Sequence, residues 1–215
     1  MTELNRELPL FPLEQVVLFP GVSLPLRIFE ERYKVMIGSC QVTDQLFGVL
    51  LIRSGQEVGA PAVPERVGCT ARMLRVERVP DGRMHILTTG EQRFQLLGPA
   101  RVTAEGYLVG DIRFLSDEAG SVGPEVVHAV TEEFTRYRAA ASSTTKRQLP
   151  SSFPEVPDDA RALSYYVAAR LHVHPRERQQ LLEIDDVGAR LEQELKLLRR
   201  ENRPPPPSIG PFSRN

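Results

Sequence analysis

The N-terminal part of the chain alternates short apolar segments with prolines, and a helical pattern follows them. The apolar segments are residues 8–13 (LPLFPL), 17–21 (VLFPG) and 24–28 (LPLRI). Because proline fixes φ and has no N–H to donate, these segments predict short edge strands and turns. Helical spacing then places several apolar side chains on one face and predicts a helix that begins near Phe29. These side chains are Phe29, Tyr33, Met36, Ile37 and Cys40.

Residues 45–115 have the patterns of β-strands. A continuous apolar run at 45–52 predicts a strand that is covered on both faces. Alternation begins at Val67 and slips in phase at Leu74, which indicates a bulge in a long, bent strand. Further strands are predicted at 84–88, 93–97 and 102–115. Many bent strands separated by turn signals predict a small closed or partly closed barrel.

From residue 121 the apolar spacing changes to that of helices. The predicted helices begin at Pro124, at Asp158 or Asp159, near Pro175 and at Asp185, where a proline or an aspartate cap marks the start. A loop rich in Ser, Thr and Pro is predicted at 141–157. The amphipathic segments together predict a four-helix bundle.

The two patterns predict an α+β protein in two parts. We expect a β domain over residues 6–117 and a helical bundle over residues 121–203. The prolines at 204–207 favour polyproline geometry, so we expect a proline-rich, disordered tail at 204–215.

Several short motifs follow one another in a characteristic order and spacing. They are 8–13 (LPLFPL), 17–21 (VLFPG), 24–30 (LPLRIFE), 32–33 (RY), 48–52 (GVLLI), 57–59 (EVG), 67–71 (VGCTA), 81–83 (DGR), 90–94 (GEQRF), 181–183 (LLE) and 190–191 (RL). With these motifs the chain resembles the Lon protease N-terminal (substrate-binding) domain family over residues 8–200. The resemblance implies a PUA-like β pseudo-barrel followed by the four-helix bundle. It also implies a stand-alone domain that recognises polypeptide segments without acting on them.

Composition and charge are those of an ordinary globular protein. The chain of 215 residues has a formal net charge of −1, so no overall field draws it to nucleic acid or to an anionic membrane. Its N-terminus lacks the features of a secretory signal, and no apolar stretch approaches the ~20 residues of a membrane span. Cys40 and Cys69 are the only cysteines, and without a secretory context a disulfide is not expected. We therefore expect a cytoplasmic protein that has no membrane partner.

The sequence gives little support to enzyme chemistry. A phosphate-cradling loop ends in Gly-Lys-Ser/Thr, and neither Lys34, Lys146 nor Lys196 has this context. The ATPase and protease modules of Lon are therefore expected to be absent. His172 and His174 lie at a predicted helix end, where capping or solvation is a simpler interpretation than a metal site. We predict no catalytic residue, no cofactor and no metal.

Candidate binding residues lie in the proline-rich N-terminal strands, which cannot all bury both faces. The candidates for peptide binding are Leu10, Phe11, Phe19, Leu24 and Phe29. They would capture an apolar segment in a groove between barrel and bundle. The expected partners are unfolded or exposed apolar polypeptide segments, and beyond them a protease or a chaperone.

Arg27 interrupts one of these apolar strands, between Leu26 and Ile28. A buried guanidinium needs a carboxylate, and Glu30 or Glu31 is close in sequence. We therefore predict a structural ion pair between Arg27 and Glu30 that clamps the strand to the helix. A direct contact of Arg27 with a ligand is the alternative.

Two other functions remain open. An RNA-binding module would use an arginine-bearing face of the barrel, formed by Arg72, Arg75, Arg78, Arg83 and Arg93. Interleaved acidic residues and the lack of an aromatic platform disfavour nucleic acid as a partner. The other alternative is a small hydrolase with an unrecognised site, which no residue spacing supports.

Overall fold

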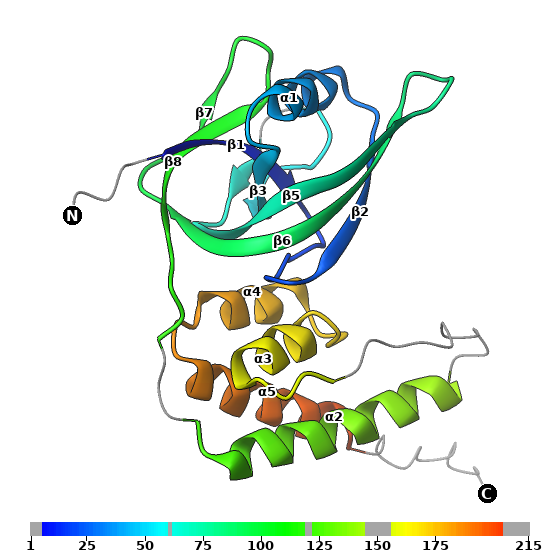
Figure 1. The fold of residues 1–215 in the computed structure, drawn as a ribbon, viewed down its shortest axis with the longest axis vertical. Helices are drawn as coiled ribbons and strands as arrows, with labels where there is room; N and C mark the ends of the chain where they lie inside the picture. Colours follow the sequence, from blue (N-terminus) through cyan, green and yellow to red (C-terminus); the bar gives the residue numbers. More distant parts are fainter. Residues whose placement is uncertain (1–5, 60–61, 119–121, 145–155, 204–215) are drawn as a thin grey trace, which may run out of the picture.

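The computed structural model describes residues 6–59, 62–118, 122–144 and 156–203, with a β-rich half packed on a helical half (Figure 1). Within these residues an eight-stranded sheet has the order β2-β6-β5-β3-β1-β8-β7, and β4 pairs with β3. The strands are β1 (Arg6–Leu13), β2 (Ser23–Ile28), β3 (Leu46–Ser54), β4 (Val63–Pro64), β5 (Val67–Arg78), β6 (Met84–Leu96), β7 (Arg101–Val102) and β8 (Leu108–Phe114). Together with the helices that follow, this sheet confirms the predicted α+β class.

Strand β6 closes the sheet on itself. One edge of β6 pairs with β5, while the other edge pairs first with β2 and then with β8. The register between β5 and β6 shifts around Thr70 and again around Leu74. Such irregularities bend a strand and increase its twist, which allows β6 to reach both partners. The bulge predicted from the phase slip at Leu74 is confirmed.

Helix α1 (Glu31–Val42) lies at the end of the barrel that is remote from the other helices (Figure 1). Its inner face buries Tyr33, Met36, Ile37 and Cys40 in the barrel core, as the helical spacing predicts. The helix begins at Glu31, with Glu30 as its N-cap residue, which agrees with the predicted start near Phe29. The side chain of Phe29 is 54% exposed and does not belong to the buried stripe.

The helical half contains α2 (Pro124–Thr144), α3 (Ala160–Ala168), α4 (Pro175–Glu183) and α5 (Val187–Glu201). Side chains at three N-termini accept hydrogen bonds from backbone N–H groups: Asp159 for α3, His174 for α4 and Asp186 for α5. These bonds satisfy donors that a helix leaves unpaired in its first turn. The prediction of Asp159 is confirmed, and the cap of α5 is Asp186, one residue later than predicted.

Helix α2 extends further than the sequence predicts. It continues to Thr144, whereas the loop was expected to begin at residue 141. The helical pattern of the first part of the segment continues because Ala and Ser at its end do not stop a helix. The remainder of the predicted loop, at 145–155, and the predicted tail at 204–215 lie outside the described residues. The limits of the two predicted domains stay a prediction.

The two halves share one hydrophobic cluster. Val17, Phe19, Leu51 and Val67 come from the β-rich half and pack with buried apolar side chains of α2, α3, α4 and α5. Strand β3 is buried on both faces from Leu46 to Leu51, as its continuous apolar run predicts. Burial of apolar surface at this contact is worth about 25 cal/mol per Å² and holds the halves together.

The helical half also buries a carboxylic acid without a partner. Glu194, on α5, is 0% exposed, and neither of its carboxylate oxygens has a hydrogen-bond partner within the described residues. Burial raises the pKa of Glu194 well above its usual range, and the charge of Arg190, one turn earlier, opposes this shift only in part. The folded protein therefore favours the protonated acid.

Replacing Glu194 by glutamine is expected to stabilise the protein at neutral pH. The unfolded carboxyl ionises near pH ~4.3, while the folded one keeps its proton to higher pH, so the parent loses stability as the pH rises above this value. Glutamine stays neutral, and we expect a gain of about 1–3 kcal/mol at pH 7 that disappears near pH ~4. Urea denaturation at both pH values measures the gain. Glu192→Gln, an exposed change on the same helix, is the control, and a gain independent of pH would contradict the assignment.

Candidate functional site

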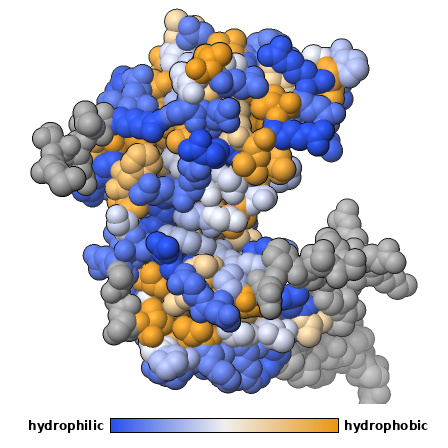
Figure 2. All heavy atoms as spheres, in the orientation of Figure 1, coloured by the Kyte–Doolittle hydropathy of each residue, from blue (hydrophilic) through white to orange (hydrophobic). Residues whose placement is uncertain are grey.

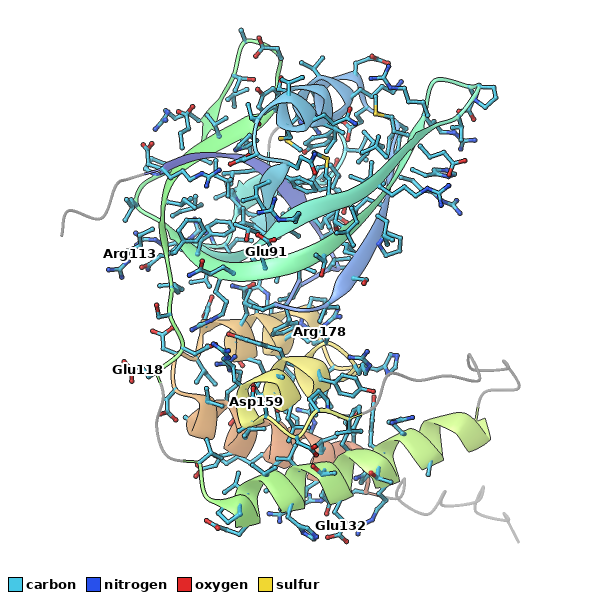
Figure 3. The ribbon with its side chains drawn as sticks, in the orientation of Figure 1. Glu91, Arg113, Glu118, Glu132, Asp159 and Arg178 are labelled. Atoms are coloured by element: carbon cyan, nitrogen blue, oxygen red, sulfur yellow. The ribbon has the colours of Figure 1, made fainter. Side chains whose placement is uncertain are left out.

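A cavity of about 630 Å³ lies between the β-rich half and the helical half. It is found where one edge of β6 changes partner from β2 to β8, and the start of α3 forms its opposite wall. Figure 3 shows Glu91, on β6, and Asp159, at the start of α3, on the two sides of this junction. The lining also includes Arg93, Asp117 and Tyr165. The cavity is therefore mixed in charge and not predominantly apolar.

Arg93 joins the two halves from the inner wall of this cavity. Its side chain is only 1% exposed, although it comes from β6. Its guanidinium donates to the carbonyl oxygens of Leu182 and Ile184, at 2.9 and 3.2 Å, and so binds the C-terminal end of α4. It also donates to the carbonyl oxygen of Ser116, at 3.2 Å. A buried charge is tolerated only with such a set of acceptors, so this contact fixes how the halves meet.

Asp117 completes the cluster from the segment after β8. One carboxylate oxygen, Oδ1, lies 3.1 Å from Nη2 of Arg93 and 2.7 Å from Nη2 of Arg190, on α5. The same oxygen accepts a hydrogen bond of 2.6 Å from the hydroxyl of Tyr165, on α3. Burial raises the pKa of Tyr165 to about 12, so its hydroxyl remains a donor. We call Arg93, Asp117, Tyr165 and Arg190 the Asp117 cluster.

This cluster was not foreseen from the sequence. The sequence places Arg93 on the arginine-bearing face of the RNA-binding alternative, and this placement is wrong because the helical half covers β6 at this point. Asp117 and Arg190 carry no signal of their contact in the sequence, because they lie 73 residues apart and meet only through the packing of α5.

The predicted peptide-binding residues do not line the cavity between the halves. Leu10 and Phe19 are both fully buried, in two separate core clusters, so the prediction that they contact a peptide is wrong. Proline spacing shows that a strand lies at an edge, but it does not show which of its faces another element covers.

The other three predicted residues, Phe11, Leu24 and Phe29, meet at a second, smaller cavity of about 240 Å³. Leu24 is half-buried, Phe29 is exposed, and Phe11 forms the inner wall, where its ring lies 4.3 Å from that of Tyr33. We call this cavity the β2 pocket. It is lined further by apolar residues, among them Leu13, Val16 and Leu26, and by the polar residues Gln15, Arg27, Glu30 and Glu57.

The β2 pocket occupies a gap in the barrel wall. Strand β2 pairs with β6 alone, and β1 beyond Leu10 pairs only with β3. The facing edges of β2 and of the end of β1 therefore share no ladder. A gap of this kind exposes both apolar side chains and backbone hydrogen-bonding groups to a ligand.

The predicted ion pair between Arg27 and Glu30 is wrong. Arg27 is exposed on β2 and forms no ion pair within the described part of the chain, while Glu30 pairs with Arg32 at 2.9 Å. The alternation of an edge strand explains this result, because Leu24, Leu26 and Ile28 take the inner face and leave Arg27 on the outer one. Arg27 is thus a free cation beside the β2 pocket.

Most arginines of the proposed RNA-binding face have acidic neighbours. Arg72 pairs with Glu91, Arg83 pairs with Asp81, and Arg75 lies 3.8 Å from Glu77. With Arg93 buried, little positive charge remains on this face to hold a phosphate backbone. Within the described residues there is also no cluster of three or more His, Cys, Asp or Glu suited to a metal ion, and no helix long and apolar enough to cross a membrane.

Comparison with known proteins gives a consistent result. A sequence model of the family described as "ATP-dependent protease La (LON) substrate-binding domain" matches residues 7–200. The Lon protease of Roseiflexus castenholzii is 28% identical over 209 residues, and Lon protease 1 of Hydrogenovibrio crunogenus is 31% identical over 196 residues. These alignments cover 93% and 88% of this chain but 25% and 23% of the relatives. The chain spans about a quarter of the length of the curated relatives it matches.

Solved structures agree with this match. A Lon N-terminal domain protein from Xanthomonas campestris is 30% identical, with a TM-score of 0.69, and the alignment covers 89% of this chain and 98% of that one. The N-terminal domain of the Lon protease of the Mycobacterium avium complex has a TM-score of 0.59 over 90% of this chain and 98% of that one. At 17% identity the second structure supports the fold alone.

The Asp117 cluster is expected to be a main source of stability. Asp117→Asn keeps the shape of the side chain but leaves the buried guanidinium of Arg190 without its carboxylate partner, while Arg93 keeps only its ion pair with Asp185, at 2.9 Å. We expect a loss of about 3 kcal/mol in the free energy of unfolding. Asp111→Asn, which removes a carboxylate that pairs with Arg101 at the exposed surface, is the matched control and should cost less than ~1 kcal/mol. Equal denaturation midpoints for the two variants would show that the cluster is not a main contributor.

Proposed function

The chain belongs to the ATP-dependent protease La (LON) substrate-binding domain family, and on that premise we propose that it binds polypeptide segments with exposed apolar side chains. The observation that carries the proposal is the exposed ring of Phe29 beside the half-buried Leu24 and Leu26, at the mouth of the β2 pocket. Exposed aromatic and aliphatic side chains that gather beside a pocket are typical of a binding surface.

The dimensions of the β2 pocket favour a single anchoring side chain. A volume of about 240 Å³ is smaller than the ~300–1,000 Å³ of sites for whole small molecules. One large aliphatic or aromatic side chain fits such a space, and burying it is worth ~1.5–3 kcal/mol. A polypeptide that exposes apolar side chains supplies this group, whereas a folded protein has most of them in its core.

We further propose that the domain recognises without catalysing. The match lies within a substrate-binding domain and covers only about a quarter of each Lon relative. A protease or a chaperone that receives the bound polypeptide is the corresponding partner. Cys40 and Cys69 are free and buried, as expected of a protein in the reducing cytoplasm. Burial raises the pKa of the Cys40 thiol to about 11, so this thiol stays protonated and unreactive at neutral pH.

Truncating Phe29 should weaken binding and leave the fold intact. We expect Phe29→Ala to lower affinity for a fluorescein-labelled, reduced and carboxymethylated α-lactalbumin about tenfold, because an aromatic anchor is lost. Leu74→Ala is the matched control, since Leu74 is 57% exposed, close to the 54% of Phe29, and lies outside the β2 pocket. Fluorescence anisotropy titrations, with denaturation midpoints for each variant, measure the effect.

Salt separates this function from the RNA-binding alternative. Apolar anchoring is expected to change little between low and high salt, whereas phosphate contacts weaken steeply as salt rises. Equal losses for Phe29→Ala and Leu74→Ala would contradict the assignment of the β2 pocket. Tight, salt-sensitive binding of RNA in place of the unfolded protein would contradict the proposed function itself.

A further inference from the structure

The free edge of β2 offers backbone hydrogen-bonding groups beside the β2 pocket. Strand β2 is the last strand of its sheet, and its only ladder is the antiparallel one with β6. Among the described residues, one further hydrogen bond reaches its backbone, from the hydroxyl of Thr88 to the carbonyl of Leu24 at 2.9 Å. An edge of this kind pairs readily with another extended chain.

Pro25 shows which residues face that edge. Proline has no N–H, so within a sheet it occupies positions whose N–H would point away from the ladder. The residue just before β2 agrees with this direction, since the carbonyl of Val22 accepts a hydrogen bond from the N–H of Gly90, on β6, at 2.8 Å. Backbone direction alternates along a strand, so Val22 and Leu24 bond to β6, while Ser23, Pro25 and Arg27 point outward. Ser23 and Arg27 therefore present an N–H and a carbonyl, and Pro25 presents a carbonyl alone.

Side-chain alternation separates two chemistries along the same strand. Leu24 and Leu26 turn to the inner face and are half-buried in the β2 pocket, while Arg27 alternates to the outer face, where it is exposed at the rim of the same pocket. No carboxylate within the described residues lies within ion-pair distance of Arg27. Glu30, the acid nearest in sequence, is already paired with Arg32. An added chain thus meets on one face a hollow that is mainly apolar but is bordered by Glu30 and Glu57, and on the other face a cation that forms no ion pair within the described residues.

We propose that the polypeptide binds β2 as an added β-strand, and this inference rests on the proposed function of the β2 pocket. Residues directly opposite each other in paired strands place their side chains on the same face. The residue opposite Arg27 therefore lies on the outer face, and its sequence neighbour points into the pocket. The preferred segment is extended and has a large apolar residue directly next to Asp or Glu.

A helical ligand does not satisfy the same groups. Its N–H and carbonyl groups are bonded within the helix, so Ser23 and Arg27 would keep unpaired backbone groups at the contact. Strand addition gives affinity through main-chain bonds and selectivity through alternate side chains. The two modes therefore differ in how they respond to changes in the peptide backbone.

The test uses the full chain and fluorescein-labelled peptides with a central Glu-Leu pair in a Thr/Ser background. Two further peptides have N-methyl groups on alternate residues, one on the even and one on the odd positions. In strand addition one of these patterns removes the donors that face β2, and the other leaves them intact. We expect one N-methyl peptide to lose binding by about tenfold or more and the other to keep it.

Arg27 provides the second arm. Arg27→Glu is expected to weaken binding of the Glu-Leu peptide about threefold to tenfold and to strengthen binding of a Lys-Leu peptide, while Arg27→Gln gives intermediate values. The denaturation midpoints should stay close to that of the parent, because Arg27 is exposed and unpaired. Equal responses to both N-methyl patterns, or no effect of charge reversal, would overturn strand addition. In that case Phe29→Ala still tests the proposed function, because loss of apolar binding does not depend on the backbone mode.

Discussion

A guanidinium group cannot leave water without acceptors around it, and the arrangement of this protein depends on how that requirement is met at Arg93. The side chain leaves the barrel from β6 and finds its acceptors in two places: at the end of α4 with Asp185 just beyond it, and in the segment after β8, on Ser116 and Asp117. Because the acceptors come from parts of the chain far apart in sequence, they can surround Arg93 in only one relative position of the halves. Figure 2 shows that the molecule narrows between the two halves and that hydrophilic and intermediate residues cover this narrow part on the visible face.

The course of β6 connects this junction with the β2 pocket. Beyond its pairing with β2, strand β6 has an irregularity between Gly90 and Arg93, opposite Thr70 of β5. It then presents Arg93 to the helical half and joins β8. A flat strand could not pair with both β2 and β8 along the same edge. The bend that closes the sheet therefore also leaves β2 as an end strand with an open side. The packing of the two halves at Arg93 and the free edge of β2 therefore both depend on the course of β6.

Sequence patterns predicted the elements well and the environments of single residues less well. Periodicity and caps located the barrel strands, the helices and the bulge at Leu74, because these depend on neighbours along the chain. The structure reverses the predicted environments of two arginines: Arg27, predicted to be buried and paired, is exposed, and Arg93, predicted on an accessible face that could bind RNA, is buried. Both lie in strands with apolar neighbours, and only the position of the helical half decides which is covered. Phe19 and Phe29 differ for the same reason, since one faces the helices and the other faces water.

An unpaired strand edge can pair with a second copy of the protein as well as with a ligand, and two residues of β2 affect both kinds of pairing. Edges left open in natural sheets are blunted by proline and by charges, which oppose permanent pairing with a second copy. Pro25 removes a donor from the middle of the free edge, and Arg27 places a cation on its outer face. Two copies of β2 paired edge to edge would bring two unneutralised guanidinium groups to the same face, whereas an acidic, extended segment would meet the cation favourably. The same two residues that disfavour self-association therefore select the kind of chain that can bind.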